Sequence, residues 1–248
     1  MADDITAELW CNGEKISYKH YSLEEYVKYF ERADSTQDGV VEALRVIRAM
    51  IDFGYYAQQY LFKVKPELAE TYTEVKRYYA TQYDFTSIKR MTESHSLNNA
   101  GNIDVADSEI NSLGISIAVE SATAIVIYLG TETAAPEIKV GKDTLSLDNP
   151  EIVGSTYTWR LREISARNGG RKFEVRIEGI SPHNLDKVFT VKGTAGGAFT
   201  IKISTFSYID YVLSQSSMAY LDEAKMLVAS MYALHEAEVE YRNYMSNH

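Results

Sequence analysis

The segment Phe173-Glu-Val-Arg-Ile-Glu178 decides the fold class of this chain, because apolar and charged residues alternate along it without interruption. Side chains on a strand point alternately to opposite faces of a sheet, so a period of two predicts one buried and one exposed face. The same alternation recurs at Tyr157/Trp159/Leu161 and at Phe199/Ile201/Ile203. These three segments predict half-buried antiparallel strands.

Further strand segments fill the middle of the chain. They are separated by Gly, Asn-Pro or Asn-Gly-Gly breaks and lie at Ile115 to Val119, Ala124 to Leu129, Glu137 to Val140, Leu145 to Leu147 and Phe189 to Val191. About eight short strands with such breaks predict a sandwich of antiparallel sheets, with Trp159 in its core. The motif Gly193-x-x-Gly196-Gly197 lies between two strands and lacks the Gly-Lys-Ser/Thr of a phosphate loop, so it predicts a hairpin turn.

Glycine and tyrosine are distributed in opposite ways along the chain. Of the 14 Gly, 3 precede residue 101 and 11 lie between Gly101 and Gly197; of the 19 Tyr, 11 lie in residues 1 to 83 and 6 in residues 208 to 248. Glycine marks turns between strands and weakens helices. The distribution therefore predicts a β module between two helical ends that pack together.

The first residues predict a hairpin followed by a helix. Ile5 to Cys11 and Lys15 to Lys19 flank Asn12-Gly13, which supplies the positive φ angles of a two-residue turn. Ser22-Leu-Glu-Glu25 has the form of a capping box, so a helix is expected to run to about Arg32.

Four more helical segments follow from periodicity and capping. Val40, Leu44, Ile47, Ile51, Gly54, Ala57 and Leu61 form one stripe of a helix that starts near Asp38. Pro66 fits the first turn of another helix, expected to reach about Tyr83. Near the C-terminus, Ser207-x-x-Asp210 predicts a cap for a short helix, and the period of residues 221 to 241 predicts a last helix to about Asn243.

These elements predict an α+β chain that forms one composite unit of three parts. Residues 1–105 form the N-terminal hairpin and helical part, in which the polar segment Thr92 to Ser108 is an exposed linker to the sheets. Residues 106–205 form the β-sandwich, and residues 206–248 form helices that pack on the N-terminal ones.

The charge balance argues against binding of nucleic acid. The chain has 25 Lys plus Arg against 35 Asp plus Glu, a formal net charge of −10, and no basic stripe interrupts this acidic character. No stretch is long and apolar enough to predict a membrane helix, and residues 1 to 5 lack the features of a signal peptide. Cys11 is the single cysteine, which excludes an intramolecular disulfide and predicts a packed or idle thiol.

No motif in the sequence predicts catalysis. The 5 His lie far apart without a second His or Cys at ligand spacing, and no nucleophile or phosphate-loop motif is present. We therefore expect a protein that is not an enzyme and that has no metal site and no cofactor.

Tyrosines are the candidate binding residues. Tyr55-Tyr56 and Tyr78-Tyr79 are adjacent pairs on expected helices, and neighbours on a helix lie about 100° apart, so both members cannot face one narrow core stripe. An exposed tyrosine combines a large contact area with little rotamer entropy. Packing of helix on helix is the competing role. The candidates for recognition are Tyr55, Tyr78, Tyr79 and Tyr83.

Five segments resemble a module that is repeated in large secreted and surface proteins of gut clostridia and ruminococci. They are Tyr21-Ser-Leu-Glu-Glu-Tyr26, Ala49-Met-Ile-Asp-Phe-Gly-Tyr-Tyr-Ala-Gln58, Ile180-Ser-Pro-His-Asn-Leu-Asp-Lys-Val-Phe-Thr-Val191, Phe206-Ser-Tyr-Ile-Asp-Tyr-Val-Leu213 and Ala229-Ser-Met-Tyr-Ala-Leu234. In that module a tyrosine-rich helical part precedes a β-sandwich and a closing helix. Tyr55 stands where the module commonly has a small residue, which makes it a candidate for specialised contact.

The resemblance implies a secreted or cell-surface module of a larger multidomain protein. Its expected role is adhesion-like binding of a host macromolecule, most plausibly a protein such as immunoglobulin. Two alternatives remain open: a carbohydrate-binding module of a glycan-degrading protein, and a structural spacer.

Overall fold

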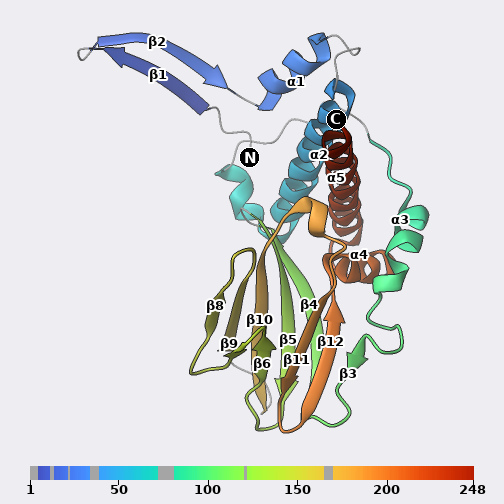
Figure 1. Ribbon diagram of the computed structural model, residues 1–248. Coiled ribbons are helices and arrows are strands. Elements are labelled where there is room, and N and C mark those ends of the chain that lie inside the picture. Colours follow the sequence, from blue (N-terminus) through green and yellow to red (C-terminus); the bar gives the residue numbers. More distant parts are fainter. Residues whose placement is uncertain are drawn as a thin grey trace. The chain divides into compact units, whose positions relative to one another are not determined.

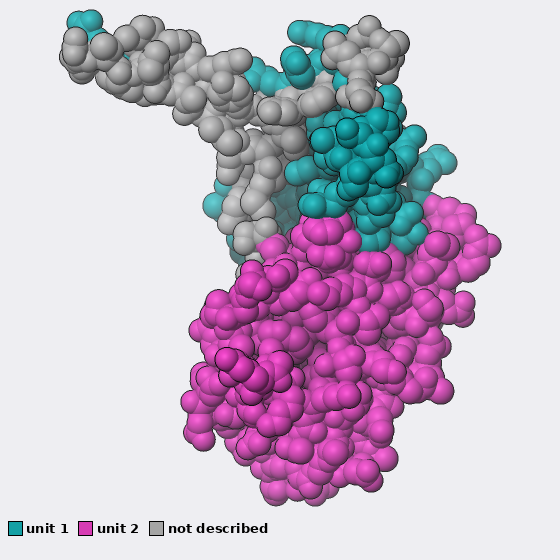
Figure 2. Space-filling model, viewed as in Figure 1, with its two compact units in different colours: residues 1–83, 218–248 teal, residues 84–217 magenta. Residues whose placement is uncertain are grey.

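The structure is a computed structural model that describes residues 5–11, 14–21, 23–33, 39–71, 81–119, 122–164 and 170–248. The chain forms two compact units (Figure 2). The helical unit comprises Met1–Tyr83 and Met218–His248, and the sheet unit comprises Asp84–Ser217. The sheet unit is therefore one continuous stretch of chain between the two segments of the helical unit.

The sheet unit contains two antiparallel sheets of five strands each (Figure 1). One has the order β4-β5-β10-β9-β8 and the other β3-β12-β11-β6-β7. The strands are β3 (Ile103–Asp104), β4 (Ile110–Val119), β5 (Thr123–Thr131), β6 (Glu137–Val140), β7 (Asp143–Leu145), β8 (Glu151–Val153), β9 (Thr158–Ile164), β10 (Arg171–Ile180), β11 (Phe189–Thr194) and β12 (Ala198–Ile203).

Each of the eight expected strand segments corresponds to a strand, and the α+β class is confirmed. The number of about eight strands was too low, because β3 and β8 are two and three residues long. A period of two cannot be recognised in so few residues.

The completely buried side chains of the central strands lie on one face of their sheet. Ile127 and Leu129 of β5 and Phe173 and Val175 of β10 are completely buried. Val175 pairs with Ile127, and Phe173 pairs with Leu129. Strand alternation thus places branched and aromatic side chains opposite one another, where burying each one stabilises the fold by about 1.5–3 kcal/mol.

The predicted glycine turn is confirmed between β11 and β12. Gly196 has a φ of +71°, which an L side chain rarely adopts, and the Gly197 carbonyl accepts a hydrogen bond from the Ala195 amide at 2.9 Å. A Cβ atom on Gly197 would lie 1.6 Å from the backbone oxygen of Asp107. Glycine is required here because two backbone segments approach each other directly.

The prediction of an exposed linker at Thr92 to Ser108 holds only in part: residues 98–101 are exposed, but the stretch also contains ordered elements and buried residues. This stretch contains the end of α3 (Phe85–Thr92), a 3-10 turn η2 (Glu93–His95) and β3, and both Thr92 and Ser96 are buried. The sequence analysis missed helix α3. Its N-cap is Asp84, whose carboxylate accepts hydrogen bonds from the amides of Thr86 and Ser87. The polar residues of the stretch from Thr92 to Ser108 form hydrogen bonds with one another. For example, the Asn102 side chain donates a hydrogen bond to the Ser96 carbonyl at 2.8 Å.

The helix α4 (Thr205–Ser214) begins one turn earlier than expected. Its N-cap is Ser204, which exchanges two hydrogen bonds with Ser207, from Ser207 N to Ser204 Oγ at 3.2 Å and from Ser204 N to Ser207 Oγ at 3.1 Å. Ser207 therefore takes the third helical position of a capping box, the place usually held by Glu or Gln. The predicted partner Asp210 lies inside the helix and is buried.

The helical unit begins with the predicted hairpin. Strands β1 (Ile5–Cys11) and β2 (Glu14–Tyr21) pair antiparallel, with a register shift between Leu9 and Trp10. Helix α1 (Leu23–Arg32) follows as expected. The turn residues Asn12-Gly13, the cap Ser22 and the Cys11 side chain lie outside the part of the chain that the structure describes.

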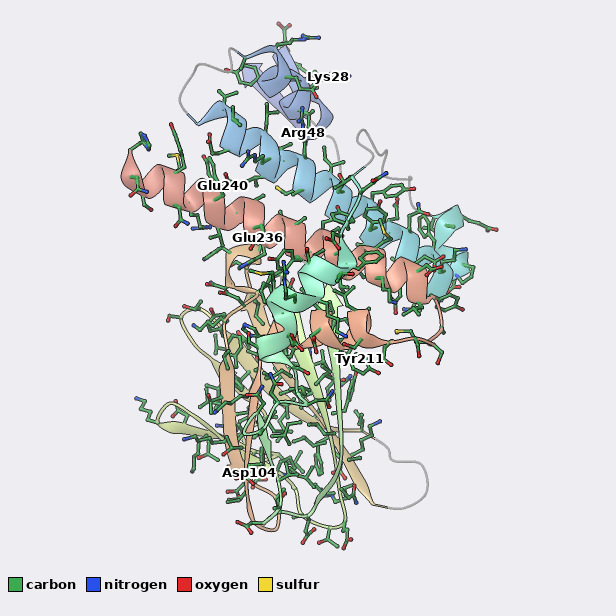
Figure 3. The ribbon with its side chains drawn as sticks, turned by 90° about the vertical axis from the view of Figure 1, so that its right-hand side faces the viewer. Lys28, Arg48, Asp104, Tyr211, Glu236 and Glu240 are labelled. Atoms are coloured by element: carbon green, nitrogen blue, oxygen red, sulfur yellow. The ribbon has the colours of Figure 1, made fainter. Side chains whose placement is uncertain are left out.

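Two long helices from opposite ends of the sequence form the body of the helical unit. Helix α2 (Val40–Val64) contacts α5 (Leu221–Asn247) extensively, and both confirm predicted helices. The start of α2 meets the end of α5 through the pair Arg45–Glu240, and the end of α2 meets the start of α5 through Lys63–Glu223, so the helices are antiparallel (Figure 3). Distant ends of like composition do pack together, as the tyrosine distribution predicted.

The helix expected from Pro66 to Tyr83 was wrong in extent. Pro66–Glu70 forms a short 3-10 turn, η1, and residues 81–84 are not helical, while residues 72–80 lie outside the described part of the chain. The physical reason is visible at the far end, where Thr81 and Tyr83 both direct their hydroxyls to Asp52 of α2. Two residues outside any regular element thus bring their hydroxyls to one carboxylate.

We predict that residues 84–217 fold without the rest of the chain. All ten strands of the two sheets, together with the helices α3 and α4, belong to this stretch, and its core contains the completely buried residues of β5 and β10. The excised segment is expected to unfold cooperatively, with strand-rich circular dichroism and dispersed amide resonances. A segment that binds apolar dyes and lacks a cooperative transition contradicts this division.

Substitution of glycine by alanine is expected to have opposite effects at two positions. Gly197→Ala places a methyl group against the Asp107 backbone and should destabilise the sheet unit by about 1–3 kcal/mol or more. Gly54→Ala, in the middle of α2 with nothing within 4 Å of the new atom, should stabilise the helical unit by about 0.5–1 kcal/mol. Chemical denaturation of both variants measures the difference, and equal effects would refute the argument.

Candidate functional site

Two of the four predicted binding residues are described, and both lie in one cluster of the helical unit. Tyr55 is half-buried on α2, and Tyr83 is half-buried at the end of the segment that returns to α2. Tyr56, next to Tyr55, is buried. The members of this adjacent pair thus differ in burial, as expected for neighbours about 100° apart on a helix. Tyr78 and Tyr79 lie outside the described residues.

The buried carboxylate of Asp52 is the centre of this cluster. Its side chain is 3% exposed on α2. The Tyr83 hydroxyl donates a hydrogen bond to Asp52 Oδ2 at 3.1 Å, and the Thr81 hydroxyl donates to the same oxygen. A buried charge needs such donors, because an unpaired carboxylate away from water is costly.

Three tyrosine rings pack edge to face around this carboxylate. The ring centroids of Tyr55 and Tyr56 are 5.1 Å apart, and those of Tyr56 and Tyr83 are 5.9 Å apart. Burial, followed by the charge of Asp52, raises the pKa of the Tyr83 hydroxyl well above its usual value. The hydroxyl therefore stays protonated and remains a donor at every physiological pH. The cluster fixes the position of Tyr55 through its contact with Tyr56 and leaves its ring half-buried.

A second candidate site is an open hollow in the sheet unit. It has a volume of about 200 Å³ and lies between the end of β6 and the β8–β9 connection. Its lining combines apolar, aromatic and small hydroxyl residues: Val140, Ile152, Gly154, Ser155, Thr156, Tyr157 and Trp159.

Aromatic contacts hold the walls of the hollow in place. The ring of Phe189 in β11 meets Tyr157 edge-on at 5.0 Å and Trp159 edge-on at 6.1 Å between centroids. Lys187 places its ammonium group 4.5 Å from the centre of the Tyr157 ring. Trp159 was expected in the core rather than as a sugar platform; it contacts the core residue Phe189 and also forms a half-buried wall of the hollow. Such walls are preorganised for an inserted group.

Sequence reasoning missed this hollow, although a local pattern contains most of it. Gly154-Ser-Thr-Tyr157 forms the β8–β9 turn, in which the Gly154 amide donates to the Tyr157 carbonyl at 3.0 Å. The aromatic residues after a glycine turn were visible in the sequence. Their convergence with Val140 and Phe189 was not, because these residues belong to the other sheet.

A histidine–serine contact near α4 is structural. His95 Nδ1 lies 2.8 Å from Ser204 Oγ, a geometry that resembles a base next to a nucleophile. Ser204 is 1% exposed, and its oxygen accepts the capping hydrogen bond from Ser207. No substrate reaches this oxygen, so the contact anchors η2 to the cap of α4.

Among the residues that the structure describes, no group of three or more His, Cys, Asp or Glu is arranged to hold a metal ion. Within the same residues, no helix is long and apolar enough to cross a membrane. Comparison with protein families, with characterised proteins and with solved structures found no match to this chain.

We expect Tyr83→Phe to destabilise the helical unit by about 1–2 kcal/mol, because Asp52 loses one of its hydroxyl donors. Tyr220→Phe is the matched control, since this tyrosine of the same unit is 45% exposed. Urea denaturation followed by tyrosine fluorescence measures both variants. Equal stability of the two would show that the Asp52 contact contributes nothing.

Proposed function

We propose that this protein is a non-enzymatic, secreted or cell-surface module of a larger bacterial protein and that it binds a host protein such as immunoglobulin. The resemblance of its five motifs to a module of gut bacterial surface proteins supports the location and the class of partner. We further propose that the two sheets form a β-sandwich that serves as the rigid scaffold of the binding surface.

The aromatic hollow is the observation that carries the binding role. Its volume of about 200 Å³ is below that of most small-molecule sites, roughly 300–1,000 Å³, and suits one inserted side chain. Trp and Tyr are the residues most enriched among energetic anchors of protein interfaces. Phe189 fixes Tyr157 and Trp159 before binding, so little side-chain entropy is lost on association.

Carbohydrate binding is the second candidate, and the same hollow favours it. Ser155 and Thr156 bring hydroxyl groups next to the aromatic walls, and sugar recognition combines an apolar ring face with such hydrogen-bonding groups. Tyr55, together with Tyr78, Tyr79 and Tyr83, remains the proposed contact set on the helical unit.

The binding test compares variants of the two units against two probes. Pooled secretory immunoglobulin on a biosensor and a glycan array are presented to the full chain, to Trp159→Ala and to Tyr55→Ala. We expect the full chain to bind immunoglobulin and Trp159→Ala to weaken this binding about 30-fold or more, as for an anchor that contributes about 2 kcal/mol. The control is Tyr211→Ala, which changes an exposed tyrosine of α4 and should leave the affinity unchanged.

A second variant separates binding from folding. Ser155→Arg fills the hollow from an exposed turn without removing a core contact, and should abolish binding while the melting temperature stays unchanged. The alternative outcome is a full chain that binds glycans and not immunoglobulin. If Trp159→Ala or Ser155→Arg removes that glycan binding, the carbohydrate-binding candidate replaces the protein-binding proposal. Loss of binding only in Tyr55→Ala would move the site to the helical unit.

A further inference from the structure

Strand β4 is the one long edge among the four ends of the two five-stranded sheets in the sheet unit. The other three ends are β3, β7 and β8, which have two, three and three residues, whereas β4 has ten. Among described strands, β4 is paired only with β5. Every second residue along its free side therefore presents an amide and a carbonyl group to the outside.

Burial along β4 shows that this edge is open. Ile115 and Ile117 pair with Ile127 and Ile125, which are 0% and 1% exposed, yet both β4 residues are only half-buried. No residue of β4 is buried. Its inward-facing row is apolar but incompletely covered: no described strand other than β5 pairs with β4, although α4 contacts part of it.

The sequence of β4 lacks the features by which proteins usually protect an edge strand. From Asn111 to Val119 it contains no Lys, Arg, Asp, Glu or Pro. By contrast, the short edge β8 carries Glu151, which pairs with Arg160 at 2.7 Å. Natural edge strands are kept short or charged to prevent pairing with another chain, and β4 is neither.

We propose that β4 pairs with β4 of a second copy of this chain, so that two five-stranded sheets continue into one. The strand is complementary to itself. With Ile115 opposite its own copy, all nine residues 111–119 pair, and Leu113 faces Ile117 on the apolar side. On the other side Gly114 faces Ser116, and Ser112 faces Ala118, so small residues meet small residues.

This register follows from two physical constraints. A shift by one residue would place the apolar row of one copy beside the small polar row of the other, because side chains alternate between the faces of a sheet. A shift by two keeps the faces matched but shortens the paired segment. No like charges oppose each other within the strand pair, although the whole chain has a net charge of −10.

The mass of the full chain in solution tests the proposal. Light scattering during size-exclusion chromatography should show a mass that rises with concentration to that of two chains. Ser112→Lys/Ser116→Lys introduces four like charges at the strand pair and should raise the dimer dissociation constant about tenfold or more. Ser214→Lys/Ser216→Lys, exposed positions at the end of α4 and beyond, is the control and should leave it unchanged.

Two readouts identify the surface even if a lysine variant unfolds. In a Cys11→Ser background, Ile115→Cys should form a disulfide-linked dimer, whereas Ile117→Cys, on the same face but opposite Leu113, should not. Hydrogen exchange of the amides of residues 111–119 should slow as concentration rises, while that of residues 151–153 stays constant. A monomer at all concentrations, or a dimer unaffected by the charges on β4, would overturn the proposal.

Discussion

The pairing of β5 with β10 is the interaction on which the sheet unit depends. These strands are adjacent inside one sheet and supply half of the completely buried apolar residues of the sheet unit. Their pairing runs from Thr131–Arg171 to Ile125–Ile177 without a shift, so every inward side chain of one strand meets an inward side chain of the other. A register error here would reverse both faces at once.

This central pair is buried on its second face as well, which imposes a constraint on charge. Glu174 of β10 is 4% exposed, and its carboxylate accepts a hydrogen bond from Arg162 of the adjacent β9 at 2.8 Å. Arg162 extends to the surface, with 65% of its side chain exposed. The ion pair thus joins a buried carboxylate to a solvent-exposed guanidinium. Removal of Arg162 would leave the buried Glu174 carboxylate without this partner, a change that destabilises other proteins strongly. The period of two predicts an exposed Glu174, and only the neighbouring strands show why it is covered.

The elements that the sequence predicted are those in which one local period extends over several turns or residues. Helices α2 and α5 and strands β5, β9, β10 and β12 all satisfy this condition. The elements that were missed are short or depend on distant partners. Strand β3 forms where Ile103 and Asp104 pair with β12, and residues 81–84 are not helical where Thr81 and Tyr83 donate hydrogen bonds to Asp52. The candidate sites show the same division. Adjacent tyrosines pointed to Tyr55, but the hollow at Trp159 requires Val140 and Phe189 from the other sheet.

The positions of the hollow and of the β4 edge make the two proposals compatible. In the order β4-β5-β10-β9-β8, the free edge is at one end of the sheet and the hollow adjoins the strands at the other end (Figure 1). Pairing through β4 therefore leaves Tyr157 and Trp159 of each copy accessible. A dimer then presents two hollows to one multivalent target, and the second contact forms at a high effective concentration without any new interaction. Under these two proposals, weak binding by each small hollow would suffice for retention at a surface when two copies act together, and the edge of the sheet would set how strongly its opposite end holds a ligand.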